Sequence, residues 1–369
     1  MSNPWDWTDE LGPEKIVYVH DAAAEMRGVV AIDNTAAGPS IGGVRMAPDV
    51  SAEEAFRLAR AMTFKNAAAG LRHGGGKAVL FGDPHWSDDR KEPIVRAFAQ
   101  AIRNLSEYIP GPDMGTNERC MAWIKDEIGR SVGLPREIGG IPLDEIGATG
   151  LGLVASADVA VRYCDLELAG ARVAIQGYGN VGRHAARLLA ARGAVIVAVS
   201  DSGGVTIDPQ GLTISALDEL KAAGRSVSEH RLGQPGAGEE ILDVECEIWI
   251  PAARPDVVTR ENVGRLDTRL VLQGANIPFT LEAEQILHER GVLIVPDFIA
   301  NAGGVICAAV EYQGGGEQQA IETIESKIGA NVEAVLARAQ SSGRPPREAA
   351  LSLAEERVRS ASALRRWHR

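Results

Sequence analysis

The sequence predicts an α/β protein with two domains and a helical C-terminal end. The chain has 369 residues, a length for which two domains are the expected number. Its first part mixes alternating apolar segments with amphipathic ones, and a later part runs strand, glycine turn, helix and strand in succession. Such a succession is typical of a parallel sheet covered by helices. We place the first domain at residues 1–145, the second at 146–320 and the helical end at 321–369.

The first domain begins with two strands and a long helix. Alternating apolar residues predict strands over 15–19 and 27–32. A helix starts at Ser51, because a serine followed three residues later by Glu54 has the pattern of a capping box. The glycine-rich run 71–84 comes next. Four apolar residues recur along the helix at helical spacing, namely Ala55, Leu58, Ala59 and Met62, and beyond it we expect a strand over 78–81 and a helix over 91–105.

The second domain is predicted from a regular alternation of elements. Glycine and proline become frequent over 139–150, which favours a hinge there. From Ile321 onward the pattern is helical, and we expect the basic residues 365–369 to form a solvated terminus. Between these points, apolar segments with helical segments among them predict strands over 172–176, 194–199, 248–250, 270–272 and 292–295.

Composition argues against several classes of function. The net charge of −12 argues against a nucleic-acid partner, because phosphate binding needs clustered lysine and arginine. No apolar run approaches the ~20 residues that span a bilayer, and the N-terminus lacks a signal-peptide pattern. The histidines are scattered and the cysteines lie far apart, a pattern that favours neither a metal site nor disulfides. We expect a cytoplasmic, metal-free protein with reduced thiols at Cys120, Cys164, Cys246 and Cys307.

A dinucleotide-binding turn is predicted at Gly177-Tyr178-Gly179-Asn180-Val181-Gly182. The pattern G-x-G-x-x-G occurs in many turns, but here a strand leads into it and an amphipathic helix over 183–192 leads out of it. The first glycine permits the tight turn, the second lets the backbone approach a pyrophosphate, and the third lets helix and strand pack closely. N–H groups at the helix N-terminus favour phosphate. A βα turn that binds no ligand is the alternative.

Asp201 indicates which dinucleotide is bound. It ends the next predicted strand, close to the ~20 residues beyond the glycine turn at which a ribose-binding acid is expected. A carboxylate there accepts hydrogen bonds from a free 2′-hydroxyl and repels a 2′-phosphate. The sequence therefore favours NAD over NADP.

Lys65 is a first candidate for substrate binding. It continues the apolar stripe of the first helix, three residues beyond Met62, and so points where core residues are expected. A lysine facing inward is costly unless an anion meets it. The alternative is a buried stem whose ammonium group reaches water.

Lys77 follows three consecutive glycines and is the candidate general base. A phosphate-binding loop is excluded, because Leu71 and Ala78 stand where that loop needs its first glycine and a serine or threonine. Flexible or tightly turned glycines would place Lys77 at the edge of a cleft, where burial and a second lysine both lower its pKa. Asp113 is a third candidate, whose carboxylate would balance the lysines and transfer protons; a turn-forming aspartate is the alternative there.

Several stretches of the chain resemble the glutamate/leucine/phenylalanine/valine dehydrogenase family. Residues 38–46 and 60–70 are similar to the leucine dehydrogenase branch, whereas 199–205 and 273–278 look more like glutamate dehydrogenases. The resemblance covers most of the chain. The family's active-site signature is matched by Leu71-x-x-Gly74-Gly75-Gly76-Lys77-x-Val79-x-x-x-Asp83-Pro84.

The resemblance implies a reaction and a role for each candidate. The substrate domain would come first and a Rossmann-type domain second, with the C-terminal helices returning to the first domain and a cleft that closes during turnover. Lys65 would hold the substrate α-carboxylate, Lys77 would activate water, and Asp113 would transfer protons at the substrate nitrogen. Hydride would pass from the α-carbon to NAD, and water would convert the imine to a 2-oxo acid and ammonia. Near cofactor and substrate would lie Thr149, Ala275, Asn276 and Asn301.

The expected substrate side chain is apolar. In glutamate dehydrogenases a lysine before the paired glycines and a serine on a later helix bind the side-chain carboxylate, but here Ile41 and Ala308 hold these places. A buried carboxylate without partners is strongly unfavourable. We therefore expect leucine, valine or phenylalanine as substrate, with glutamate as the alternative. The residues expected around the side chain are Ile41, Gly42, Met62, Gly111, Val305 and Ala308.

Two other classes of function compete with this one. A non-catalytic, nicotinamide-binding regulatory protein would not require the two lysines and the aspartate. A reductase of 2-oxo acids that does not use ammonia would usually carry a catalytic histidine with an arginine; the nearest histidine, His73, is expected to be a solvated loop residue. We expect a homo-oligomer that acts on small molecules.

Overall fold

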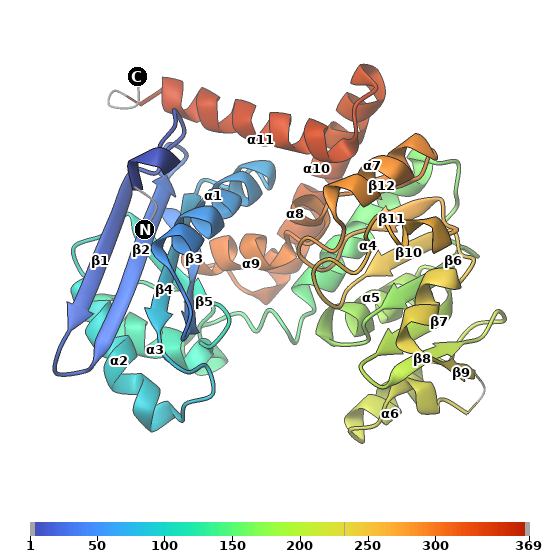
Figure 1. The fold of residues 1–369 in the computed structure, drawn as a ribbon, viewed down its shortest axis with the longest axis horizontal. Helices are drawn as coiled ribbons and strands as arrows, with labels where there is room; N and C mark the ends of the chain where they lie inside the picture. The colour runs from blue at the N-terminus through green and yellow to red at the C-terminus, as the bar shows by residue number, and fades with distance from the viewer. Residues whose placement is uncertain (1–3, 232, 366–369) are drawn as a thin grey trace. The chain divides into compact units, whose positions relative to one another are not determined.

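The computed structural model describes residues 4–231 and 233–365 and divides into two compact units. The first unit combines Met1–Leu143, Val305–Ala320 and Leu351–Arg369, and the second combines Asp144–Gly304 and Ile321–Ala350. Each unit holds one sheet with helices (Figure 1). The predicted α/β class with two domains is therefore confirmed. Most of the basic C-terminal residues, for which we expected a solvated terminus, lie outside the described residues.

The units differ from the predicted domains near the C-terminus. Residues 305–320, which we placed in the second domain, group with the first unit, and residues 321–350 group with the second. Helix α11 (Pro346–Ala363) brings the chain back to the first unit, where Arg357 donates hydrogen bonds to the backbone oxygens of Ala67 and Ala68 at 3.0 and 2.6 Å. Helical periodicity shows that an apolar face exists, but it does not show which core that face joins.

The first sheet has five strands in the order β1-β2-β4-β3-β5. Antiparallel pairs join β1 to β2 and β2 to β4, and β3 pairs in parallel with both β4 and β5. The two predicted N-terminal strands are confirmed. The sequence did not predict β3 and β5, because glycine and proline inside them weaken the strand pattern. The elements are β1 (Lys15–Asp21), β2 (Met26–Asn34), β3 (Ser40–Ala47), α1 (Ala52–Ala68), β4 (Gly74–Phe81), α2 (Asp88–Ala101), β5 (Tyr108–Pro112), α3 (Glu118–Ile128), η1 (Pro4–Trp7) and η2 (Arg136–Ile138).

Helices cover both faces of this sheet (Figure 1). Successive side chains of a strand point to opposite faces. On β4, Val79 packs in a cluster with residues of α1, whereas Leu80 packs in the larger cluster formed with α2 and α3. Lys77 is two residues before Val79 and so projects from the face that α1 covers.

Helix α1 begins as predicted. The hydroxyl of Ser51 accepts a hydrogen bond from the backbone N–H of Glu54 at 3.1 Å. Its fully buried face differs from the predicted stripe and carries Ala55, Ala59, Thr63 and Asn66, with Leu58, Met62 and Lys65 only partly buried beside it. Lys65 therefore lies at the margin of the core and not within it, because the small residues let the helix approach the strands closely and shift the contact face.

The second sheet has seven strands in the order β12-β11-β10-β6-β7-β8-β9. The five predicted strands are present and parallel. A hairpin over Ser202 and Gly203 adds β8 antiparallel to β7, and β9 pairs antiparallel with β8 further along the chain; the sequence did not predict either strand. The strands are β6 (Arg172–Gln176), β7 (Val195–Asp201), β8 (Gly204–Ile207), β9 (Gln234–Gly236), β10 (Ile248–Pro251), β11 (Leu270–Leu272) and β12 (Leu293–Val295).

The remaining helices belong to the later part of the chain. None of the helices within residues 4–231 and 233–365 is both long enough and apolar enough to cross a membrane. The α-helices are α4 (Ala148–Ala160), α5 (Asn180–Ala191), α6 (Ile214–Ala222), α7 (Leu281–Glu289), α8 (Asp297–Ala300), α9 (Gly303–Tyr312) and α10 (Glu317–Ser342), and the short 3-10 helices are η3 (Val161–Tyr163), η4 (Val227–Glu229), η5 (Gly238–Asp243) and η6 (Val263–Arg265).

Candidate active site

The three glycines before Lys77 lie inside strand β4, not in a turn. Gly74, Gly75 and Gly76 are all buried. A side chain on Gly75 would collide with the backbone nitrogen of Thr63 on α1, and a Cβ on Gly76 would lie 2.9 Å from the ring of Tyr108. Our expectation of flexible or tightly turned glycines at a cleft edge is therefore wrong. Glycine is needed at these positions because α1 and β5 approach this strand closely. Lys77 is therefore held on a closely packed, rigid strand.

The buried Lys77 forms an ion pair with the partly buried Asp113. Only 7% of Lys77 is exposed, and its Nζ contacts Oδ2 of Asp113, the residue that follows β5. The backbone N–H of Met114 donates to Oδ1 of Asp113 at 2.6 Å. A Cβ on Gly43 would lie 2.7 Å from the Cβ of Asp113, so this glycine of β3 leaves the space that the Asp113 side chain occupies. The structure thus brings together the predicted base and the predicted proton carrier.

The pKa values of this pair follow from burial and charge. Burial lowers the pKa of Lys77, the carboxylate of Asp113 raises it, and Arg45 lowers it again; the net change is downward. For Asp113, burial raises the pKa, but Lys77 and the N–H of Met114 outweigh it and the pKa falls. We expected Lys65 to be the cation that depresses the Lys77 pKa. In the structure Arg45 is a cation that lowers this pKa, and burial has the larger effect.

Sequence reasoning missed the residues that surround the pair. Arg45 NH2 lies 3.6 Å from Asp113 Oδ1, and its NH1 bonds Glu54 at 2.7 Å. Thr116 donates from Oγ1 to the backbone oxygen of Val44 at 2.7 Å and accepts from the N–H of Asp113 at 3.0 Å. Glu54 was assigned only as part of a helix cap. No local sequence signal distinguishes Arg45 and Thr116 from surface residues, because their role arises from parallel pairing of β3 with β5.

An apolar cluster in the same unit joins two of the predicted pocket residues. Ile41, 3% exposed, packs with Ile109 and Val132, and Ala308 of α9 lies against this group. A Cβ on Gly111 would lie 3.2 Å from Val132. The sequence did not identify Ile109 and Val132. Of the other residues predicted for this pocket, Gly42 is buried in β3, and Met62 on α1 and Val305 on α9 are partly buried.

His73 is buried and not a solvated loop residue as we expected. It is 4% exposed, its Nδ1 lies 3.0 Å from the backbone oxygen of Pro39, and its ring meets the edge of Tyr312 at 5.7 Å between centroids. Burial lowers its pKa. A neutral, packed imidazole fits a structural role beside β4.

The glycine turn of the second unit has the geometry that the motif predicts. Gly177 has φ +97°, a side chain on Gly182 would overlap the backbone oxygen of Gly177, and Gly179 faces open space as the N-cap of α5. Helix α5 begins at Asn180, three residues before the predicted start. The N–H groups of its first turn, at Asn180 and Val181, are therefore free to meet an anion.

Polar atoms in the second unit fit a nucleotide cofactor. In the described part of the chain, Gln176 Oε1, Arg183 Nε and Asn301 Oδ1 are buried without a hydrogen-bond partner. Gln176 immediately precedes the glycine turn and Arg183 lies in the first turn of α5. Unpaired buried polar atoms are unfavourable, so these groups fit a polar ligand beside the open Gly179.

The residues that the resemblance placed near the cofactor also belong to this unit. The side-chain nitrogen of Asn301 donates to Oδ1 of Asn276 at 2.9 Å, and Ala275 N–H donates to the oxygen of Pro251 at 2.8 Å. Thr149 stands in the first turn of α4. Asn301 was predicted to bind substrate, and the structure shows it bonded to Asn276 within the second unit.

Asp201 ends β7 as expected, but its carboxylate is already occupied. Oδ1 accepts from the N–H of Gly203 at 2.9 Å and from Ser226 Oγ at 2.7 Å. Oδ2 accepts from Lys221 Nζ at 2.7 Å and from the N–H of Val227 at 3.1 Å. Burial raises the pKa of Asp201, but these donors outweigh it and lower the pKa overall. A carboxylate has about four acceptor positions, and all are used here.

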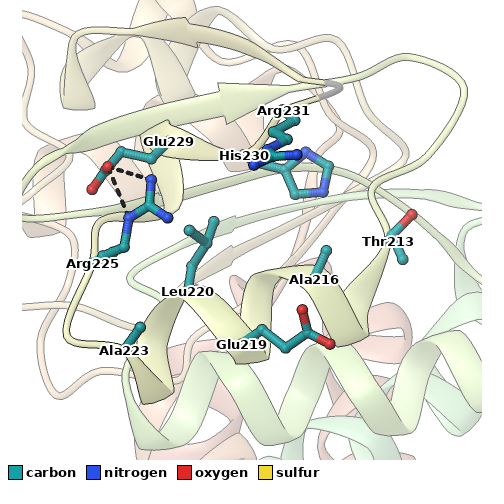
Figure 2. Close-up of a pocket in the computed structure, with 9 residues that line it drawn as sticks. All are labelled: Thr213, Ala216, Glu219, Leu220, Ala223, Arg225, Glu229, His230 and Arg231. Atoms are coloured by element: carbon teal, nitrogen blue, oxygen red, sulfur yellow. Dashed lines mark hydrogen bonds and ion pairs between the residues drawn. The ribbon is translucent and has the colours of Figure 1, made fainter.

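A separate pocket of about 590 Å³ lies on the second unit, between α6 and the residues that follow it. Figure 2 shows the Arg225–Glu229 ion pair on one side, with bonds of 3.0 and 2.7 Å, and Ala216 and Leu220 of α6 on another. None of the residues predicted for catalysis, substrate or cofactor lines it. We therefore do not assign it to the active site. In the described residues, no group of three histidine, cysteine, aspartate or glutamate side chains is arranged to hold a metal ion.

Comparison with known protein families gives two matches that together span most of the chain. The model for "Glutamate/Leucine/Phenylalanine/Valine dehydrogenase" matches residues 139–366. The model for "Glu/Leu/Phe/Val dehydrogenase, dimerisation domain" matches residues 13–130.

Individual relatives carry related names. A glutamate dehydrogenase of Aeropyrum pernix is 38% identical over 357 residues, covering 90% of this chain and 85% of the relative. An NADP-specific glutamate dehydrogenase of Saccharolobus shibatae is 37% identical, covering 76% and 69%. An NAD-specific glutamate dehydrogenase of Staphylococcus aureus is 34% identical, covering 92% and 86%.

Two solved structures share the fold. The hetero-hexameric glutamate dehydrogenase of Thermus thermophilus, in its leucine-bound form, superposes with a TM-score of 0.83 at 29% identity and covers 98% of this chain and 92% of that one. The L-tryptophan dehydrogenase of Nostoc punctiforme superposes with a TM-score of 0.76 at 27% identity and covers 95% and 97%.

Proposed function

Because this chain belongs to the glutamate/leucine/phenylalanine/valine dehydrogenase family, we propose that it oxidatively deaminates an L-amino acid at the Lys77–Asp113 pair. The substrate and water would give a 2-oxo acid and ammonia, in a reversible reaction. The nicotinamide, when bound, accepts the hydride that leaves the α-carbon. The observation that carries the proposal is a lysine with a lowered pKa, fixed on a rigid strand and paired with a carboxylate.

Lys77 acts in its neutral form as the base that takes a proton from water. Burial favours that form, because desolvation penalises the ammonium. Asp113 exchanges protons with the substrate nitrogen, and its contact with Lys77 lets the pair hold one proton between them. Lys65, partly buried on α1, meets the substrate α-carboxylate. A non-catalytic, nicotinamide-binding protein would not require Lys65, Lys77 and Asp113 together.

Two observations point to different substrates. The names of the relatives support glutamate better than our preference for leucine or valine. The apolar cluster around Ile41 supports an apolar side chain, because its members Ile109, Val132 and Ala308 offer a carboxylate no cation. Sequence similarity to the named relatives thus supports glutamate as substrate, whereas the apolar cluster around Ile41 supports an apolar amino acid.

The Ile41→Lys variant separates these candidates. A lysine there adds a cation to the apolar cluster, so kcat/KM for glutamate relative to leucine should rise by roughly 10- to 100-fold, the size of a hydrogen bond to a charged group. The matched control, Ile41→Met, keeps the position apolar at similar volume and should leave the ratio unchanged. A ratio equal in both variants would show that the Ile41 cluster does not meet the substrate side chain.

A substrate panel tests the proposed function. The purified chain is offered leucine, valine, phenylalanine and glutamate, first with NAD and then with NADP, while absorbance of the reduced cofactor is followed. We expect at least one pair to react. Glutamate reacting faster than every apolar amino acid would refute the Ile41 argument but keep the enzyme class, whereas no reaction with any pair would refute the enzyme class.

The cofactor is a pyridine nucleotide. We propose that the chain binds NAD more tightly than NADP, but that this preference is smaller than a free carboxylate would give. Lys221 compensates the charge of Asp201, which reduces the repulsion of a 2′-phosphate. The Lys221→Met variant should therefore bind NADPH at least about tenfold more weakly relative to NADH. Titration calorimetry with each cofactor measures the ratio. Equal weakening for both cofactors would contradict this role, and the exposed Lys125→Met serves as control.

We further propose a homo-oligomer in the cytoplasm. The first unit matches a model named for dimerisation, which supports self-association, and the related Thermus thermophilus structure, described as a hetero-hexamer, supports an oligomer. The four cysteines are free, which fits a reducing compartment.

A further inference from the structure

Glu311 is a buried carboxylate that the proposed reaction does not use. It lies near the end of α9 and is 9% exposed. Burial raises its pKa, and hydrogen bonds from backbone N–H groups offset this only in part. Burying a carboxylate costs free energy, which hydrogen bonds to it offset.

The partners of Glu311 are backbone groups at the two ends of one loop. Oε1 accepts from the N–H of Leu134 at 3.2 Å, and Oε2 accepts from the N–H of Ile141 at 2.8 Å. The 3-10 helix η2 lies between these two donors. Glu311 therefore links the two ends of the loop 134–141 through hydrogen bonds.

The residues just before this loop pack on the strand that leads to Asp113. The N–H of Val132 donates to the backbone oxygen of Pro110 at 2.9 Å. Gly133, with φ +70°, sits so close to Pro112 that a side chain there would overlap the proline ring. Pro112 directly precedes Asp113. A shift of the segment 132–134 would therefore also displace the carboxylate of Asp113, which pairs with Lys77.

The same segment also supplies one wall of the apolar cluster. Val132 packs with Ile41 and Ile109, and Ala308 lies on α9 one helical turn before Glu311. Glu311 thus ties together two elements, α9 and the segment 132–134, that both line this cluster.

We propose that Glu311 is a positioning residue, which holds the segment 132–134 against the end of β5 and thereby sets the contact between Asp113 and Lys77. This inference rests on the proposed function of that pair. It assigns Glu311 no contact with substrate or cofactor. Displacement of a reacting group by about 1 Å can cost 10²-fold in rate, so loss of the hydrogen bonds to Glu311 should lower kcat by roughly 10- to 100-fold.

The dependence of kcat on pH distinguishes a positioning role of Glu311 from a merely structural role. The informative feature is the acidic limb, the pH range over which kcat rises as the catalytic base loses its proton. The carboxylate of Asp113 raises the pKa of Lys77. If Asp113 moves away, the pKa of Lys77 falls, and the acidic limb of the kcat profile moves to lower pH. A loss of stability alone would lower the amount of active protein but would leave that limb in place.

The test compares full-length Glu311→Ala and Glu311→Gln with the wild type. The glutamine keeps one acceptor oxygen and covers the case in which the alanine variant does not fold. Hydrogen exchange over 133–141, kcat against pH and the Kd for NADH are measured on each folded variant. The matched control is Glu317→Ala, which removes an exposed carboxylate 3.7 Å from Arg136 of the same loop.

We expect faster exchange over 133–141, a lower kcat and a limb at lower pH to occur together, with an unchanged Kd for NADH and a control like the wild type. Faster exchange with a wild-type kcat and limb would overturn the inference, and so would a lower kcat with unchanged exchange. Variants that show no change at all would also overturn it, because the carboxylate would then not hold the loop. A wild type that binds NADH but oxidises no amino acid would refute the proposed function instead.

Discussion

The Lys77→Ala variant is expected to lose kcat by roughly 10²- to 10⁴-fold, the usual contribution of a positioned general base. Lys77 is the group whose neutral form is favoured by burial, and the neighbouring Arg45 does not replace it, because an arginine side chain does not serve as a general base. The Kd for NADH should not change, because the glycine turn belongs to the other unit. Steady-state kinetics with the best substrate of the panel measures the first effect, and titration calorimetry measures the second.

A matched control separates loss of chemistry from loss of a buried lysine. Lys91 on α2 is 6% exposed, and its Nζ donates to the backbone oxygen of Pro84 at 2.7 Å. Lys91→Ala removes a buried ammonium from the same unit and should reduce stability while keeping kcat. Equal losses of kcat in both variants would contradict the assignment of Lys77, because the effect would then come from damage to the first unit.

The Asp113→Asn variant is expected to move the acidic limb of the kcat profile to lower pH, besides lowering kcat by about 10²-fold. The sign follows from the charge. Asp113 stabilises the protonated Lys77 and so raises its pKa; without that charge the pKa falls. Because the base works in its deprotonated form, activity then persists at lower pH than in the wild type.

Kinetics across the pH range checks the direction of this shift. The control is Asp88→Asn, whose carboxylate forms an exposed ion pair with Arg119. We expect its limb to coincide with that of the wild type. A limb that moves to higher pH in Asp113→Asn, or that does not move, would show that Lys77 is not the group whose titration limits the reaction.

The glycine turn and the start of α1 were predictable because they depend on local patterns. The glycine turn needs three glycines at fixed spacing between a strand and a helix, and the structure shows the φ of Gly177, the open space at Gly179 and the close packing at Gly182. The capping pattern at Ser51 is equally local. Such features involve residues that are near in sequence, so a single chain displays them.

The errors arose where distant segments meet. The glycines before Lys77 pack against α1 and β5, and this contact is not visible in a run of glycines. Asp201 ends its strand as predicted, but no pattern near it indicated that Lys221 and Ser226, which lie 20 and 25 residues further along the chain, donate hydrogen bonds to its carboxylate.

The surroundings of the catalytic pair show the same limit. Arg45 reaches Asp113 only because β3 and β5 pair in parallel, and neither strand was predicted. Val132 and Glu311 belong to segments far apart in the chain that meet in one unit. Long-range pairing of this kind decides which side chains surround the reacting groups. The periodicity of residues within one segment does not predict which distant segment it will contact.

The balance of products tests the central claim most directly. The purified chain is incubated with its best amino acid and cofactor, and reduced nicotinamide, ammonia and 2-oxo acid are each quantified from the same sample. Oxidative deamination at the Lys77–Asp113 pair predicts the three products in equal amounts, and none of them above background with Lys77→Ala. Reduced nicotinamide without ammonia, or the same yields from wild type and Lys77→Ala, would contradict it.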